Sequence, residues 1–278
     1  MLDLLVHCHD VEAFTAAPRY AAQLAGALGA ALTGLHSVAS PPRLQPDDVP
    51  ASLQGEFAAF VREEIERAER AGGEFARRAG SFGVRRTHWQ VAQGPLADIL
   101  VACGNWNDLL VLEHRERVPR VCETISRVVL AGVPCLVVRE SAAPAPPSLN
   151  CVAIAWNGSP EALRAVRAAL PILQLAQRVF VLSTPVPARD GDRAAGVLCE
   201  PEFSLASHLE RHRVAAQAIA LDAAQRPIEE AILLGAAHVG ADLLVMGAFG
   251  SSRTHAHDAR GVTHYILEHG GLPLLLQH

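Results

Sequence analysis

Short apolar runs alternate with longer amphipathic stretches along the whole chain, and this alternation predicts strands separated by helices. Runs such as 109–112 are apolar at every position, which predicts strands that helices cover on both faces of a parallel sheet. We expect five such strands in each half of the chain: 2–8, 31–38, 87–92, 108–113 and 134–139, then 151–156, 178–184, 215–221, 242–247 and 273–277.

Two segments recur in the same order in both halves. The sequence Asn-Asp-Leu-Leu-Val-Leu at 107–112 resembles Ala-Asp-Leu-Leu-Val-Met at 241–246, and Gly-Val-Pro at 132–134 resembles Gly-Leu-Pro at 271–273. The proline-rich segment 140–149 lies between the two halves of the chain. It cannot continue a helix or a central strand, because proline fixes φ and lacks an N–H. We therefore predict an internal duplication, with domains 1–141 and 149–278, each a doubly wound five-stranded parallel sheet.

Local signals place two of the helices. Phe57, Phe60 and Ile65 recur at helical spacing within 52–80, among Glu and Arg side chains, so we expect one long amphipathic helix with a solvated charged face. In the second half, Ser159 followed by Pro160 predicts the start of a helix, with the serine as cap and the proline in the first turn.

Composition narrows the classes of function. The 278 residues are 50% hydrophobic and 19% charged, which suits two packed α/β domains. The net charge of −5 includes no basic stripe, so we expect no nucleic-acid partner. No basic leader opens the chain and no apolar run approaches the ~20 residues that span a bilayer, so we expect a cytoplasmic protein and no membrane partner. The six cysteines form no C-x-x-C pair, and we expect them to be reduced.

The second half carries segments that together resemble the universal stress protein family in its tandem, two-domain type. These segments are Ala-Trp-Asn-Gly-Ser-Pro-Glu-Ala at 155–162, Asp-Leu-Leu-Val-Met-Gly-Ala-Phe-Gly at 242–250, and the stretch from Gly-Val-Thr at 261–263 to Pro273. The resemblance implies a Rossmann-like fold of the adenine nucleotide alpha hydrolase type, with the two halves packed as a pseudo-dimer. It also implies a non-enzymatic stress-response or regulatory protein that binds an adenine nucleotide such as ATP.

Nucleotide-binding members of that family carry Gly-x2-Gly-x9-Gly-Ser/Thr after the fourth strand, where glycines let the backbone approach phosphates. Here Gly247 and Gly250 match the pattern, but Arg260 replaces the third glycine and Gly261 occupies the Ser/Thr position. Arg260 either blocks the turn or donates to a phosphate, and Asn157 stands where relatives have an acidic residue. The resemblance thus implies a nucleotide site at Ala155, Asn157, Thr184, Met246, Gly247, Gly250, Ser251, Arg260, Gly261, Val262 and Thr263.

The first half lacks the corresponding glycines. Its loop begins at Glu113, also contains Glu116, and is five residues shorter, because 26 residues separate Asp108 from Pro134 and 31 separate Asp242 from Pro273. These carboxylates would repel phosphate. With His9 at the acidic position of its first strand, the first half is expected to bind no nucleotide.

Histidine clusters raise a metal hypothesis, which we do not adopt. His208 and His212 lie one helical turn apart, and His255, His257 and Asp258 lie near the expected phosphate loop. We find no Gly-x-Ser-x-Gly nucleophile motif and predict no catalytic residues. The alternatives are a small-ligand or metal-binding module without nucleotide, and a weak nucleotide hydrolase. An unidentified protein partner and a homodimer are also expected for the family type.

Overall fold

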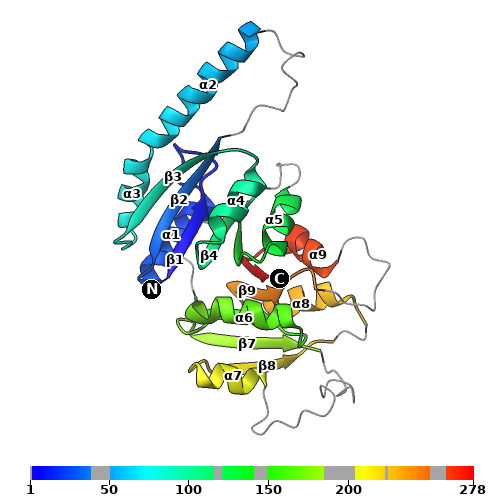
Figure 1. Cartoon of the computed structure of the whole chain (residues 1–278). Helices are drawn as coiled ribbons and strands as arrows, with labels where there is room; N and C mark the ends of the chain where they lie inside the picture. Colours follow the sequence, from blue (N-terminus) through cyan, green and yellow to red (C-terminus); the bar gives the residue numbers. More distant parts are fainter. Residues whose placement is uncertain are drawn as a thin grey trace, which may run out of the picture. The chain divides into compact units, whose positions relative to one another are not determined.

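In the computed structural model the chain divides into two compact units, Met1–Pro147 and Ser148–His278, which are described separately below (Figure 1). The structure describes residues 2–38, 51–115, 121–140, 149–184, 204–222, 225–250 and 261–278. In the part of the chain so described, no helix is long and apolar enough to cross a membrane.

The first unit is a parallel sheet with strand order β3-β2-β1-β4-β5. Its strands are β1 (Asp3–His7), β2 (Ala31–Val38), β3 (Thr87–Gln93), β4 (Leu109–His114) and β5 (Cys135–Arg139). Its helices are α1 (Ala16–Leu28), α2 (Ala51–Arg70), α3 (Gly72–Gly80), α4 (Leu96–Gly104) and α5 (Val121–Leu130). Helix α1 contacts α3, and α4 contacts α5, so helices cover both faces of the sheet. All six residues of β4 are buried. The apolar run 109–112 predicted this for the first four residues, and Glu113 and His114 are buried in addition.

The second unit repeats this topology, with strand order β8-β7-β6-β9-β10. Its strands are β6 (Cys151–Ala155), β7 (Arg178–Ser183), β8 (Ala216–Ala220), β9 (Leu243–Gly247) and β10 (Leu274–Gln277). Its helices are α6 (Pro160–Leu173), α7 (Leu205–Arg211), α8 (Ile228–His238) and α9 (Val262–His269). Helix α6 packs on β9 and β10, whereas α8 contacts α9. The predicted fold class, two tandem doubly wound five-stranded parallel sheets, is confirmed.

The duplication extends to individual hydrogen bonds. Asp108 accepts the backbone N–H of Asp3 on its Oδ2 at 2.8 Å, and Asp242 accepts the N–H of Cys151 on its Oδ2 at 3.0 Å. In both units the aspartate precedes the fourth strand and fixes the start of the first. The first and fourth strands pair in the same register in both units: Leu4 pairs with Leu109, and Val152 pairs with Leu243. This shared register aligns the two copies residue by residue.

The predicted helix over 52–80 is wrong in one respect, because the structure divides it into α2 and α3 at Ala71. Gly72 follows the break, and a Cβ there would lie 3.0 Å from the Trp89 ring. Two consecutive glycines weaken the helix, and the indole packs closely where the side chain is missing.

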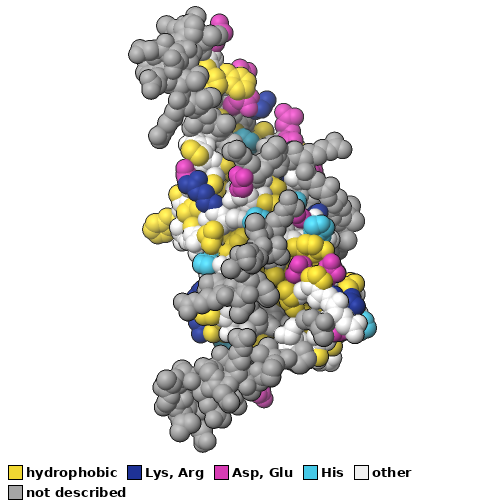
Figure 2. Space-filling model, turned by 90° about the vertical axis from the view of Figure 1, so that its right-hand side faces the viewer, with side chains coloured by type: hydrophobic (Ala, Val, Ile, Leu, Met, Phe, Trp, Pro, Cys, Tyr) yellow, Lys and Arg dark blue, Asp and Glu magenta, His cyan; other side chains and the backbone are white. Residues whose placement is uncertain are grey.

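The remaining local predictions concern α2 and α6. On α2 the charged Arg62, Glu63 and Glu66 are exposed as predicted. Phe57 and Phe60 are also 37% and 58% exposed, and Figure 2 shows hydrophobic side chains among charged ones at the upper end of the molecule, over this helix. At the start of α6, the Ser159 hydroxyl accepts the N–H of Ala162 and Pro160 occupies the first turn, as predicted.

Candidate functional site

The predicted nucleotide site lies at the carboxyl ends of β6 and β9, the two neighbouring strands at the centre of the second unit. Ala155 ends β6 and pairs with Met246 of β9, so the structure brings these two predicted residues together. In parallel doubly wound sheets, ligands bind at this edge, where the strand order reverses. Both residues are buried, at 8% and 5% exposure, and Met246 directly precedes Gly247.

Gly247 has no space for a side chain. A Cβ added there would lie 2.5 Å from the backbone nitrogen of Ala162 and 2.8 Å from the backbone carbon of Glu161, both in the first turn of α6. Real Cβ atoms essentially never approach other atoms so closely. The end of β9 therefore touches the helix N-terminus directly, and glycine is required by contact rather than by backbone conformation.

The loop after Gly247 is held against the N-terminus of α9. The N–H of Phe249 donates to the hydroxyl of Thr263 at 3.3 Å, and Thr263 is only 6% exposed. Phe249 has φ of 54°, a left-handed conformation that is uncommon for a bulky residue. This hydrogen bond brings together the Gly247–Gly250 loop and the Gly261–Thr263 segment that the sequence predicted to share a site.

Other predicted residues have separate places. Asn157 is exposed after β6, and its Oδ1 accepts the N–H of Ser159 at 3.1 Å. Thr184 follows β7 and is partly buried. Ser251, Arg260 and the cluster of His255, His257 and Asp258 lie outside the described residues.

A carboxylate that was not among the predicted site residues lies against the glycine loop. Glu161 Oε2 is 3.2 Å from the position of a Cβ added at Gly250, and its side chain is only 16% exposed. A hydrogen bond from its own backbone N–H is the main cause that lowers the pKa of the Glu161 carboxyl, followed by the Ser159 hydroxyl. Because Glu161 is an anion on the α6 side of the loop, a phosphate would have to lie on the opposite side, toward α9.

Arg164 balances part of that charge. Its guanidinium lies 3.2 Å from Glu161 Oε1 and donates through Nε to the backbone oxygen of His278 at 2.8 Å. The His278 ring in turn lies 3.0 Å from the backbone oxygen of Ala248. Glu161 and Arg164 are three residues apart on a predicted helix, but their position beside the loop follows only from the packing of α6 on β9.

In the first unit a carboxylate occupies the place of Gly247. The strand pairing makes Glu113 the counterpart of Gly247, and Glu113 is 7% exposed. Its Oε2 accepts the Thr15 hydroxyl at 2.6 Å and the N–H of Ala17 at 3.0 Å, so it caps the N-terminus of α1. The N-terminus of α1, which could bind an anion, is therefore already occupied by the Glu113 carboxylate. Glu116, the other predicted repelling residue, lies outside the described residues.

Histidines surround this edge of the first unit. His9 stands after β1, as the alignment with Asn157 requires, and burial is the main cause that lowers its pKa. Burial, followed by His9, lowers the pKa of His7 to about 3, and the ring lies 3.0 Å from the Ser37 hydroxyl. Among the described residues, no three His, Cys, Asp or Glu side chains are grouped so that they could hold a metal ion.

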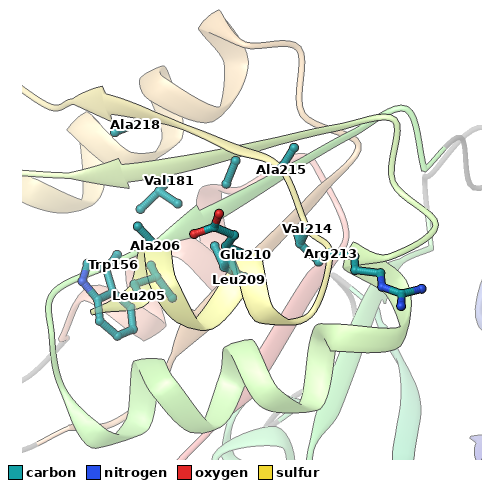
Figure 3. A pocket seen from close by; sticks show the side chains of 11 residues that line it. Trp156, Val181, Leu205, Ala206, Leu209, Glu210, Arg213, Val214, Ala215 and Ala218 are labelled. Atoms are coloured by element: carbon teal, nitrogen blue, oxygen red, sulfur yellow. The ribbon is translucent and has the colours of Figure 1, made fainter. Parts of the chain in front are cut away.

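A cavity in the second unit is lined by residues other than those of the glycine loop. It has a volume of about 510 Å³ and lies between α7 and the strands β7 and β8, with Trp156 at one end (Figure 3). Its lining is mostly apolar, and the Glu210 carboxylate points from α7 toward the sheet while the Arg213 guanidinium points away. No motif in the sequence pointed to it.

Strand register relates this cavity to a position that a side chain fills in the first unit. Gly34 pairs with Trp89 in the first unit, and the corresponding pair in the second is Val181 with Ala218. The Trp89 ring packs at 5.1 Å from that of Phe75 and donates its N–H to the backbone oxygen of Ala68. Ala218 therefore leaves open the space that an indole occupies in the first unit.

These features define a tandem pair of doubly wound α/β units with one glycine loop, in the second unit. No family sequence model and no curated protein sequence matches the chain. Among solved structures, a universal stress protein from Archaeoglobus fulgidus DSM 4304 matches with a TM-score of 0.66 and 11% identity, over 99% of this chain and 96% of that one. A functionally unknown protein from Pseudomonas aeruginosa PAO1 matches with a TM-score of 0.55 and 15% identity, over 99% and 92%. The chain thus has the tandem universal stress protein fold.

Proposed function

We propose that the chain is a universal stress protein-like, non-enzymatic regulatory protein that binds one adenine nucleotide such as ATP, in the second unit only. One observation carries the proposal. The glycine loop after β9 is hydrogen-bonded to the start of α9 through Thr263, which leaves helix N–H groups beside a close-packed glycine backbone. The counterpart of Gly247 in the first unit is Glu113, a carboxylate that already caps its own helix.

The two units are proposed to correspond to the predicted domains 1–141 and 149–278, and their packing as a pseudo-dimer stays a prediction. A cytoplasmic location, a homodimer and an unidentified protein partner also stay predictions. The exposed Asn157 amide is proposed to contact the adenosine, and Arg164 offers a nearby cation, although Glu161 already neutralises part of its charge.

Calorimetric titration of the full chain with ATP tests the proposal, and we expect a stoichiometry of one. Thr263→Val should weaken binding by about 3- to 10-fold, because a neutral hydrogen bond contributes about 0.5–1.5 kcal/mol. Thr124 stands in the first unit at the 139-residue spacing that relates Pro134 to Pro273, so Thr124→Val is the matched control. Two equivalent sites, or equal effects of both variants, would contradict the proposal. Phosphate release from ATP at the rate of a protein-free blank supports the non-enzymatic part, and faster release that Thr263→Val reduces supports the weak hydrolase.

The cavity beneath α7 favours a second candidate, a module that binds a small apolar ligand. The Glu210 carboxylate that points toward the sheet favours a neutral or cationic ligand over an anion. The neutral fluorescent probe N-phenylnaphthylamine should bind the wild type, and Ala218→Trp should abolish that binding by placing an indole where the first unit has one. ATP binding that survives in Ala218→Trp would separate the two sites, and unchanged probe binding would contradict this second function.

A further inference from the structure

A thiol and an imidazole meet in the first unit, where β4 ends and α5 begins. Cys122 Sγ lies 3.6 Å from His114 Nε2. His114 is the last residue of β4 and is 6% exposed, whereas Cys122 is the second residue of α5 and is half-buried. Consecutive side chains of a strand point to opposite faces of the sheet, so the His114 side chain lies on the face opposite to that of Glu113, which caps α1.

Three features favour the thiolate form of Cys122. An imidazole nitrogen lies within reach of the sulfur and can accept its proton. The residue lies in the first turn of a ten-residue helix, where backbone N–H groups and the helix dipole stabilise a negative charge. Arg139 pairs with His114 in the sheet and adds positive charge at this edge, against Glu123 in the same first turn.

The other described cysteines have different surroundings. Burial raises the pKa of the Cys8 and Cys135 thiols, which lie in the core. The Cys151 sulfur lies 3.3 Å from the backbone oxygen of Val239, and burial is the main cause that raises its pKa. Cys103 is partly exposed like Cys122, but burial raises its pKa as well. Among the five cysteines in the described part of the chain, Cys122 is distinguished by a sulfur atom within reach of an imidazole nitrogen.

The position of Cys122 in the duplicated fold supports a chemical role. The spacing of 139 residues that relates Pro134 to Pro273 also relates Cys122 to Gly261. Gly261 precedes α9 and forms part of the proposed phosphate end of the nucleotide site. The helix end that is proposed to face a phosphate in the second unit thus carries an ionisable thiol in the first.

We propose that Cys122, activated by His114, is a nucleophilic thiol that hydroperoxides oxidise. His114 Nε2 takes the thiol proton, and the thiolate attacks the outer peroxide oxygen. The S–O bond forms as the O–O bond breaks, and the leaving hydroxide takes a proton to become water. The sulfur is oxidised to a sulfenic acid and the peroxide is reduced, so one thiol and one hydrogen peroxide give one sulfenic acid and one water.

Alkylation of the full, reduced chain with iodoacetamide, resolved by peptide mass spectrometry, tests the activation. A thiol beside histidine commonly titrates about two pH units below an isolated one, near 8.5. At about pH 6 that shift raises the fraction of thiolate about 75-fold. A thiolate of lower pKa is also less nucleophilic, which lowers the rate about eightfold, so the net increase in the alkylation rate is about tenfold. We expect Cys122 to react with a lower pH midpoint than Cys103 in the same molecules, and His114→Asn to remove the difference.

The comparison of Cys122 with Cys103 needs no variant, so it stands even if His114→Asn fails to fold. Equal pH profiles for the two cysteines would overturn the activation. Hydrogen peroxide followed by the sulfenic-acid trap dimedone should then label Cys122 and spare Cys103, and Cys122→Ser should abolish the adduct. Rapid alkylation of Cys122 without any dimedone adduct would overturn the assignment to hydroperoxides. Neither result depends on ATP, so the nucleotide proposal is tested separately.

Discussion

Replacing His7 with asparagine should flatten the pH dependence of folding stability below neutral pH. Burial is the main cause that lowers the pKa of His7 to about 3, and neighbouring positive charges on His9 and His36 add to it. The ring lies at the end of β1, 3.0 Å from the Ser37 hydroxyl. The folded protein therefore keeps this imidazole neutral at pH values where the unfolded chain protonates it.

The size of the effect follows from the two pKa values. Between the unfolded value of about 6.5 and the folded value, the unfolded state binds more protons, so the free energy of unfolding decreases as the pH falls. From about pH 7.5 to about pH 5 this single group should cost about 2 kcal/mol. The contribution is fully present above the unfolded pKa and continues to fall until the folded pKa is reached.

Urea denaturation followed by circular dichroism at both pH values measures the loss. The wild type should lose about 2 kcal/mol more than His7→Asn, because all other titrating groups are shared by the two proteins. His88 on β3 is exposed, so His88→Asn is the matched control and should behave as the wild type. If His7→Asn loses as much stability as the wild type, a buried neutral imidazole at this position is not the cause.

Three further predictions concern a helix end, the starts of two strands, and Arg260. Glu113→Ala should destabilise the first unit by about 1–3 kcal/mol in urea denaturation, because the Thr15 hydroxyl and the Ala17 N–H lose their acceptor; an unchanged midpoint would contradict the capping role. Asp242→Ala should cost more than Asp108→Ala in the same assay, since Asp242 accepts two backbone N–H groups and Asp108 one; the reverse order would count against this. Arg260→Gly should tighten ATP binding if Arg260 blocks the loop, whereas weaker binding with a shallower salt dependence would show that it donates to phosphate.

The fold was accessible from the sequence because its signal is local and repeated. Continuous apolar runs specify strands buried on both faces, and the repeated Asp-Leu-Leu-Val segments establish the order of the strands in each half. The break between α2 and α3 was not predicted from the sequence. It depends on Gly72 and on the Trp89 ring of strand β3, which packs against Gly72 in a tertiary contact.

The candidate site was accessible only in part. Glycine spacing indicated the loop of the second unit, but the carboxylate beside it could not be inferred, because Glu161 reaches Gly250 only through the packing of α6 on β9. Glu113 was expected to repel phosphate from a loop. The structure adds that it caps a helix 98 residues earlier in the chain, a contact that no local pattern predicts.

The two copies preserve one set of positions and diverge at another, and the difference has a physical basis. Asp108 and Asp242 hold the start of the first strand in the same way, since each sheet needs that strand in register. The copies differ where a ligand would lie, at Glu113 against Gly247 and at Trp89 against Ala218. At the second pair the Trp89 ring fills space that Ala218 leaves open, whereas at the first pair Glu113 caps α1 and Gly247 packs directly against the start of α6. In the first copy both side chains make contacts within the unit, Glu113 with the start of α1 and Trp89 with Phe75, and this agrees with the proposal that only the second copy binds a ligand.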